Sequence, residues 1–410
     1  MQPVEVAAAV ADAHRREWGY VLAATVRVSR DLDLAEECVQ DAYAQALATW
    51  AERGVPSNPA AWLTTVARRR AVDLLRREAT LRTKLPLLVE DDVTQPDLDS
   101  GQIPDDRLRL ICTCCHPALA QQAQVALTLR LMCGLSTRDV ARAFLLSEPT
   151  MAARITRAKK KISAAGIPYR VPATCELPER IDAVLGVVHL LFTTGHTAPS
   201  GADLMRRDLV ERAKDLARML HLLLPDNAEV TGLLALILLT DAHRATRTAA
   251  DGRLLRLGEQ DRSRWDAAGI AEGTALVQEA IKGATPGRHV LQAAIAAVHS
   301  AAADWNDTNW AEIVALYDQL VQVWPSPVVE LNRAVAVGFA SGAAAGLAAL
   351  EPLGGEPQLA SYPYLAAARA EFLEQLHRHD EARLAYHEAL LLTENAVERD
   401  FLQRRLDAVT

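Results

Sequence analysis

Alanine, leucine and arginine dominate this sequence, and no stretch keeps the alternation of polar and apolar residues that marks a half-buried strand. All three residues are good helix formers, and runs of β-branched residues are short. Such a chain can bury its apolar side chains only by packing helices against one another. We therefore predict an all-α fold along the whole 410-residue chain.

Proline and glycine divide the predicted helices into four parts. Residues 1–78 form one compact helical unit, residues 105–165 a second, and residues 176–410 a long helical array. Between the first two units, residues 79–104 contain three prolines and a dense group of acids, Glu90, Asp91, Asp92, Asp97 and Asp99. This composition cannot bury enough apolar surface to become ordered, so we expect an extended acidic linker, with a plain spacer as the alternative.

Several features indicate a protein of the cytoplasm. No window approaches ~18 uninterrupted apolar residues, so no transmembrane helix is expected. The N-terminal residues lack a basic segment and include Glu5 and Asp12, which argues against a signal peptide. Six cysteines are too few for a disulfide framework.

The cluster Cys112, Cys114, Cys115 and His116 has a poor spacing for a tetrahedral zinc site. We predict that its thiols pack in a helical core, with a redox role as the weaker alternative. No metal and no cofactor is expected.

The net charge of −8 hides an asymmetry between the two parts of the chain. Residues 1–170 hold 23 Lys and Arg against 20 Asp and Glu, whereas the remainder holds 21 against 32. Two segments concentrate the positive charge: residues 59–77 contain five Arg and one Asp, and residues 149–163 contain five Lys or Arg and no acid. Locally basic helices favour contact with nucleic acid even when the whole chain is acidic.

The first basic segment predicts a helix that begins at Pro59, with Asn58 as its N-cap. At helical spacing, Leu63, Val66, Ala67, Ala71 and Leu74 share an apolar arc. The neighbouring arc suits phosphates and base edges, although a solvated surface helix would look similar. Its residues, with the adjacent Arg70, are Trp62, Thr65, Arg69, Asp73 and Arg76.

The second basic segment predicts a helix-turn-helix. Ser136 and Asp139 resemble a capping box at the start of the first helix, and Ser147 can cap the second. In that second helix one apolar arc is anchored, which leaves a polar face for a major groove. We predict DNA contacts from this face, with an exposed basic hairpin as the alternative; its residues are Thr150, Ala153, Arg154, Arg157, Lys160 and Lys161.

The order and spacing of these units resemble regions 2 and 4 of the sigma-70 family, in its extracytoplasmic-function group. The resemblance rests on the strings that run from Asp33 to Tyr43, from Asn58 to Leu63, from Arg68 to Arg77 and from Ala126 to Lys159. Three further strings resemble the subgroup with a C-terminal tetratricopeptide-like extension: Cys114 to Pro117, Gly166 to Pro172 and Asp261 to Asp266. Arg69 departs from the asparagine that is usual in the group, which affects fine promoter contacts.

The resemblance implies an RNA polymerase sigma factor whose partners are core polymerase, through the β′ clamp helices and β, and promoter DNA. The helix from Trp62 to Arg77 then reads the −10 element, the helix from Pro149 to Lys161 reads the −35 element, and residues 51–57 capture a flipped base. The acidic linker threads toward the RNA path. The clamp-binding surface is the acidic, amide-bearing face formed by Asp33, Glu36, Glu37, Gln40 and Asp41.

The extension shows traces of helical repeats. Ala370, Leu373, Ala382, Tyr386 and Ala389 have the small–large spacing of one tetratricopeptide unit, and residues 331–350 are compatible with another. Arrays of this kind offer a surface to a protein or peptide. The charged stretch of residues 251–266 is either a docking site that uses Arg262, Arg264 and Trp265 or an internal salt-bridged clamp.

We therefore expect a sigma factor without catalysis of its own, regulated in cis by its acidic extension. One competing hypothesis is a stand-alone helix-turn-helix regulator with a repeat sensor domain, which would give no purpose to the face from Asp33 to Asp41. The other is an enzyme in the extension, which would need a polar pocket with converging ionisable groups. His189, His196, His221 and His243 lack an accompanying phosphate loop, nucleophile elbow or His–Glu motif, so catalysis is not predicted.

Overall fold

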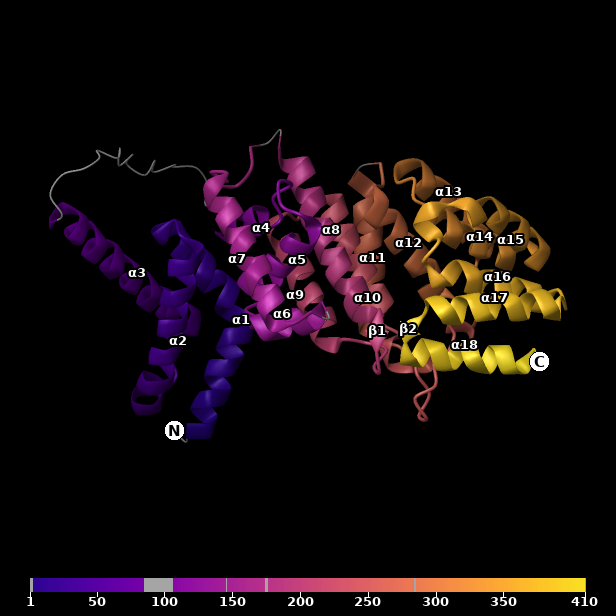
Figure 1. The fold of residues 1–410 in the computed structure, drawn as a ribbon, viewed down its shortest axis with the longest axis horizontal. Coiled ribbons are helices and arrows are strands. Elements are labelled where there is room, and N and C mark those ends of the chain that lie inside the picture. The colour runs from indigo at the N-terminus through magenta and orange to yellow at the C-terminus, as the bar shows by residue number, and fades with distance from the viewer. Residues whose placement is uncertain (1–2, 85–105, 145, 174–175, 284, 410) are drawn as a thin grey trace. The chain divides into compact units, whose positions relative to one another are not determined.

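The computed structural model describes residues 3–84, 106–144, 146–173, 176–283 and 285–409. They form helices α1 to α18 with two strands of two residues each, so the all-α prediction is confirmed (Figure 1). The chain divides into two compact units, residues 1–187 and 188–410. This boundary falls inside α8, about three helical turns beyond the start predicted for the extension at residue 176.

Unit 1 begins with three long helices that pack on one another: α1 (Pro3–Ser29), α2 (Leu32–Arg53) and α3 (Pro59–Lys84). The Asp31 carboxylate accepts hydrogen bonds from the amides of Asp33 and Leu34 at 2.7 and 2.9 Å and so starts α2. Gly54, with φ of 81°, ends it. As predicted, Asn58 caps α3, since its Oδ1 accepts the Ala61 amide at 3.0 Å.

Helix α3 continues to Lys84, six residues past the predicted end of the first unit at 78. Helical backbone therefore replaces the extended chain expected for residues 79–84. Arg and Leu in this stretch keep good helix propensity, which explains the continuation. The rest of the predicted linker, with all five of its acids, lies outside the described residues.

Shorter elements complete unit 1. They are α4 (Asp106–Cys114), α5 (Gln121–Leu127), a π-helical turn (Thr128–Met132), α6 (Thr137–Ala143), α7 (Glu148–Ala164) and the first half of α8 (Leu177–His196). The predicted helix-turn-helix is present as α6 and α7. Ser136 Oγ accepts the Asp139 amide at 3.1 Å, and Ser147 Oγ accepts the Thr150 amide at 3.3 Å.

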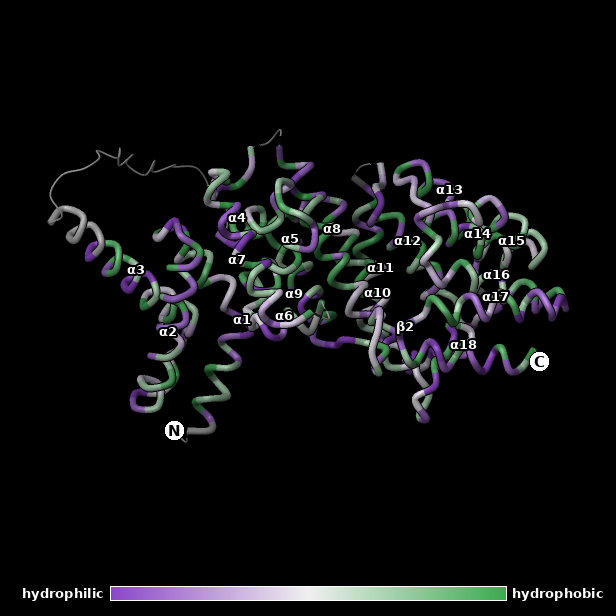
Figure 2. The backbone as a smooth tube through the Cα atoms, in the orientation of Figure 1, coloured by the Kyte–Doolittle hydropathy of each residue, from purple (hydrophilic) through white to green (hydrophobic). Residues whose placement is uncertain are grey.

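Unit 2 holds the remaining helices: α9 (Arg207–Leu223), α10 (Ala228–Asp241), α11 (Ala267–Gly283), α12 (Arg288–Ala301), α13 (Trp310–Val323), α14 (Pro327–Ser341), α15 (Ala343–Leu350), α16 (Pro363–Gln375), α17 (His379–Leu392) and α18 (Ala396–Ala408). Five short 3₁₀ helices join them: Arg244–Thr246, Leu257–Glu259, Arg262–Arg264, Glu351–Gly355 and Pro357–Leu359. Helices that are neighbours in the sequence pack on one another, including α13 with α14 and α16 with α17. Helix α10 is apolar on nearly all sides and is buried between α9, α11 and α12 (Figure 2).

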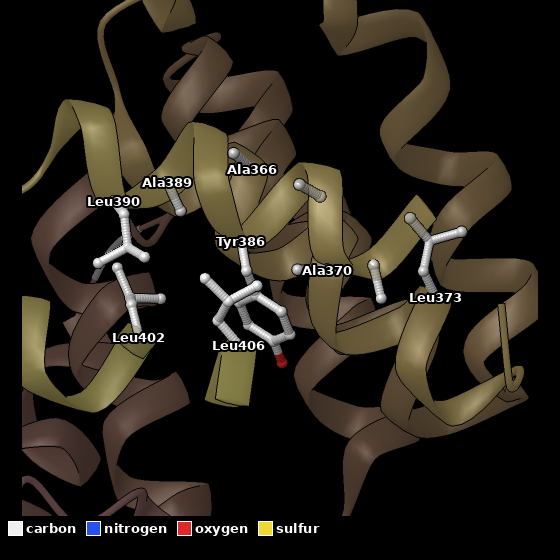
Figure 3. Packing of buried hydrophobic residues seen from close by; sticks show 10 residues of the cluster. Ala366, Ala370, Leu373, Tyr386, Ala389, Leu390, Leu402 and Leu406 are labelled. Atoms are coloured by element: carbon white, nitrogen blue, oxygen red, sulfur yellow. The ribbon is translucent and has the colours of Figure 1, made fainter. Parts of the chain in front are cut away.

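The helix pair predicted around Tyr386 is present as α16 and α17. The five residues predicted for it belong to one buried cluster, in which the Tyr386 ring lies among alanines and leucines of both helices and of α18 (Figure 3). The Tyr386 hydroxyl donates to Glu374 Oε2 at 2.7 Å and accepts from Arg405 Nε at 3.1 Å. The weaker stretch, residues 331–350, forms α14 and α15, whose close approach is made at Gly338 and Gly346 beside the Phe372 ring.

Unit 2 also joins its beginning to its end. Strand β1 (Ser200–Gly201) pairs in parallel with β2 (Glu394–Asn395). The fully buried Asn395 side chain donates to the carbonyls of Ala198 and Asp203 at 3.0 and 2.9 Å. These two-residue strands were not predicted, because so short a pairing leaves no alternating pattern in the sequence.

Candidate nucleic-acid and polymerase interfaces

The basic face of α3 is largely open to solvent, as predicted. Thr65, Arg69, Asp73 and Arg76 are exposed, while the opposite arc of Leu63, Ala67 and Ala71 is fully buried. Trp62 is half-buried because its ring packs edge-on against the Trp50 ring of α2, with centroids 5.6 Å apart. The face therefore presents threonine and arginine groups of the kind that contact phosphates and base edges.

The face of α2 from Asp33 to Asp41 is only partly exposed. Asp33, Glu37, Gln40 and Asp41 are exposed, but Glu36 retains only 6% of its surface. Asp41 Oδ2 also accepts a hydrogen bond from Arg70 Nε of α3 at 3.0 Å, with both side chains more than 40% exposed. The predicted clamp-binding face and the predicted −10 helix thus share one ion pair at the surface.

Glu36 lies at a junction between α2 and the second half of unit 1. Its carboxylate pairs with Arg130 Nη2 of the π-helical turn at 2.8 Å and with Lys159 Nζ of α7. Lys159 also donates to Asp33 Oδ1 at 2.6 Å. Burial lowers the pKa of Lys159, but the Glu36 and Asp33 carboxylates reverse this effect, so its pKa is raised and the ammonium stays charged.

Sequence reasoning missed both cationic partners of Glu36 and treated Glu36 as a surface acid. A signal was present, since Glu36 shares the helical arc of Val39, Tyr43 and Ala46, all of which are buried. A carboxylate on an apolar arc calls for a buried cation. The pattern gives no means of choosing Arg130 and Lys159, which lie far along the chain.

Helix α7 presents most of its predicted polar face. Thr150, Ala153, Arg157, Lys160 and Lys161 are exposed, and Met151, Ile155, Ala158 and Ile162 are buried on the opposite side. Three of the polar residues make contacts within the protein. Arg157 Nε donates to the Ala153 carbonyl at 3.2 Å, Lys161 Nζ donates to the Ala118 carbonyl, and half-buried Arg154 lies over the Phe144 ring.

The segment expected to capture a flipped base, residues 51–57, is partly helical. Its first three residues form the last turn of α2, and the loop begins at Gly54. Val55 and Ser57 in that loop are exposed. The loop available to a base is therefore shorter than predicted, because helix propensity carries α2 through Glu52 and Arg53.

The segment from Gly166 to Pro172, which carried part of the resemblance, joins the end of the helix-turn-helix to α1 and α4. The Tyr169 hydroxyl lies 2.8 Å from the Ala23 carbonyl of α1 and 3.2 Å from the Asp106 carbonyl of α4. Asp106 in turn lies within 4 Å of the guanidinium groups of Arg27 and Arg68.

The thiols of Cys112, Cys114 and Cys115 are buried in and beside α4, which confirms that they pack in the core. Burial raises the pKa of Cys112 to about 11 and that of Cys115 to about 12. Reactive cysteines need the thiolate, so these groups suit packing and not redox chemistry. Cys175 lies outside the described residues.

The structure contradicts the prediction that Arg262 and Trp265 dock a partner. Both residues point inward and form the internal clamp that the sequence offered as the second hypothesis. Trp265 is buried, and its Nε1 donates to Thr246 Oγ1 at 2.9 Å. Arg262 stacks on the Trp265 ring at 4.7 Å and donates to the carbonyls of His299 and Ala302. Burial of the tryptophan ring and the stacking of the guanidinium on it favour this inward arrangement. Arg264 remains exposed.

Three of the four histidines considered for catalysis, His189, His196 and His243, line one cavity of unit 2. His221 lies elsewhere, with Nδ1 3.2 Å from Thr231 Oγ1. His189 and His196 both lie on α8, two helical turns apart, whereas His243 follows α10; the sequence does not show that α10 packs beside α8 at this point. Within the described residues, no group of three or more His, Cys, Asp or Glu is arranged to hold a metal ion, and no helix has the length and hydropathy needed to cross a bilayer.

Comparison with known proteins agrees with this division of the chain. Residues 14–80 match sigma-70 region 2, and residues 110–162 match sigma-70 region 4. Residues 180–281 match a family of unknown function, DUF6596. An uncharacterized protein of Rhizobium meliloti (strain 1021) is 42% identical over 393 residues, which is 94% of this chain and 92% of that protein. No solved structure matches.

Region 2 and region 4 are the parts of a sigma factor that act in transcription initiation and DNA binding. Their presence indicates a transcription factor and implies core RNA polymerase and promoter DNA as its partners. Because both modules occur in order in one chain, this protein belongs to the sigma-70 family of sigma factors and continues into a C-terminal helical extension.

Proposed function

We propose that this chain is a dissociable specificity subunit of the extracytoplasmic-function type, which binds the β′ clamp helices through α2 and reads the −10 and −35 elements with α3 and α7. The observation that carries the proposal is the pairing of two basic helix faces with an acidic face on α2. The exposed acids Glu37 and Asp41 suit a basic partner, whereas Thr65, Arg69 and Arg157 suit DNA.

The Glu36 junction bears on how core binding proceeds. Glu36 can join an interface with polymerase only after Lys159 and Arg130 leave it, because its carboxylate is buried beneath them. We therefore assign the first contact with the clamp to Glu37, Gln40 and Asp41. Release of α7 from α2 then frees Asp33 and Glu36 and separates the two DNA-reading helices.

Reconstitution tests the core-binding step. The purified chain is mixed with bacterial core polymerase, and specific initiation is measured by transcription from genomic promoter fragments. The variants Glu37→Lys and Asp41→Lys are expected to weaken core binding by about tenfold or more through like-charge contact. Glu388→Lys, at an exposed site on α17, is the matched control and should bind as the parent does.

DNA reading has its own test. Replacing Arg157 or Arg69 by alanine is expected to lower the affinity of the holoenzyme for promoter DNA. The slope of log K against log salt concentration should decrease in magnitude by about one for each phosphate group that the protein no longer neutralises. Tight operator binding by the chain alone, with no association with core, would instead favour a stand-alone helix-turn-helix regulator with a repeat sensor domain.

We also propose that the extension regulates the sigma modules in cis, because an acidic unit is tied covalently to two basic DNA-reading helices. The test compares promoter output of the full chain with that of a chain that ends at Val187, the end of unit 1. A change in output supports the proposal, and identical output from the two chains refutes it.

A further inference from the structure

Unit 2 contains a cavity of about 1150 Å³ that the proposed transcription role does not use. Its wall is formed by α8, α10, α12, α13, α14 and α16 and by the segment from Thr393 to Glu398. Small-molecule sites in proteins occupy roughly 300–1,000 Å³, so a metabolite fits here with water to spare. Part of this wall, from α8 to Arg247, lies within the matched family of unknown function.

The wall holds polar atoms whose hydrogen-bonding capacity the protein does not satisfy. Nε2 of His196, Nδ1 of His243, Nδ1 of His299 and Oε1 of Gln292 are buried without a hydrogen-bond partner among the described residues. Native structures leave few such atoms unpaired, because burial removes their hydration. Four of them belong to residues that line one cavity, where a bound molecule with several hydroxyl groups would satisfy them.

The histidines act as neutral groups. Burial lowers the pKa of His243 and of His299 to about 4, and the nearby Arg247 and Arg262 guanidinium groups contribute to these shifts. The His196 and His243 rings lie 6.3 Å apart, centroid to centroid. A neutral imidazole offers one donor and one acceptor, so together these rings match hydroxyl groups, which also both donate and accept.

The fixed charges of the wall disfavour an anionic ligand. Arg247 donates to the His196 carbonyl and to Thr197 Oγ1, so its guanidinium is engaged by the protein. Glu398 accepts from the Tyr364 hydroxyl at 2.7 Å, and Glu394 adds a second carboxylate. One cation against two carboxylates gives a phosphate no counter-charge.

We propose that this cavity binds a neutral polyhydroxylated small molecule, whose hydroxyl groups pair with His196, His243, His299 and Gln292. Aromatic and aliphatic side chains of the wall, including Phe192, Tyr317 and Tyr362, cover the apolar faces of the ligand's ring. A sugar and the ribose of a nucleoside both have this chemistry. The assignment concerns unit 2 alone and does not depend on the proposed contacts with polymerase or promoter.

Calorimetric titration of the full chain tests the proposal with two sets of probes. The neutral probes are glucose, trehalose, adenosine and uridine, and the anionic ones are glucose 6-phosphate and adenosine monophosphate. We expect saturable binding of at least one neutral probe, and at least about tenfold weaker binding of its phosphorylated form. Binding of sugars alone identifies a carbohydrate site, and binding of nucleosides alone a nucleoside site.

Variants locate the binding. His243→Phe keeps a ring beside Trp265, and Gln292→Met keeps the side-chain length; each is expected to weaken binding about two- to tenfold, the effect of one neutral hydrogen bond. His387→Phe, at an exposed histidine on α17, is the control and should leave binding unchanged. The proposal is overturned if no neutral probe binds tighter than about 1 mM, if the phosphorylated probes bind as well, or if both cavity variants bind like the parent.

Discussion

Replacing Glu36 by glutamine is expected to loosen the junction between α2 and α7. The Glu36 side chain is 8% exposed, and the Lys159 side chain that pairs with it is 11% exposed. Glutamine keeps the shape but removes the charge, which leaves Arg130 and Lys159 with a neutral acceptor. Removing one partner of a buried pair costs about 3–5 kcal/mol.

The surviving contact to Asp33 at 2.6 Å reduces this loss only slightly. The Asp33 side chain is 78% exposed, and exposed pairs contribute about 0–1 kcal/mol. We therefore expect Glu36→Gln to lower the local free energy of opening by about 2–4 kcal/mol. Asp33→Asn, the matched control on the same lysine, should lower it by less than about 1 kcal/mol.

Hydrogen exchange of the full chain measures this free energy, read from peptides of α7 and of the π-helical turn. A double-mutant cycle of Glu36→Gln with Lys159→Met should give a coupling energy of about 1–3 kcal/mol. Equal effects of Glu36→Gln and Asp33→Asn, or full additivity with Lys159→Met, would refute the reasoning. In either case the buried carboxylate would not hold the two helices together.

Three further outcomes are expected in unit 2. Gly338→Ala should destabilise it by roughly 1–3 kcal/mol in urea unfolding, because a Cβ there would lie 2.1 Å from Phe372 Cζ; an unchanged midpoint would count against this packing. Asn395→Ala should cost about 1–3 kcal/mol by removing the donor of the buried Ala198 carbonyl and of the part-buried Asp203 carbonyl, and an Asn395→Asp change that keeps full stability would contradict that account. Burial lowers the pKa of His243 and of His299 from 6.5 to about 4, so the unfolded chain binds protons before the folded chain does as the pH falls. The free energy of unfolding should therefore be full above pH 6.5 and decrease toward pH 4. At pH 5 the expected loss is about 2 kcal/mol for each histidine. Thermal melts at pH 7 and pH 5 test this, and equal melting temperatures would show that these imidazoles are hydrated.

Local patterns in the sequence predicted the helices and their caps well. Asn58, Ser136 and Ser147 cap helices as expected. The apolar arc of α7 is buried, and that of α3 is buried at Leu63, Ala67 and Ala71 but only partly at Val66 and Leu74. These features depend on residues within one or two helical turns, so spacing alone is enough to find them. The small–large pattern around Tyr386 succeeded for the same reason.

Contacts between distant segments were beyond the sequence patterns. The sequence predicted a surface acid at Glu36 and a docking site at Arg262 and Trp265. Neither local pattern shows which distant residues will cover these side chains. The cavity histidines come from α8, α12 and the end of α10, and only the packing of these helices brings them together. Tertiary packing determines these contacts, and the periodicity of a single helix does not specify which other helix will pack against it.

The pairing of β1 with β2 has a consequence for how unit 2 unfolds. A linear repeat array frays from its two ends, since a terminal repeat has a neighbour on one side only. Here the first and last segments hold each other through Asn395, so neither behaves as a free end. Unit 2 is therefore expected to unfold in a single step, and loss of the Asn395 hydrogen bonds should loosen the segment that follows α8 together with the segment that precedes α18.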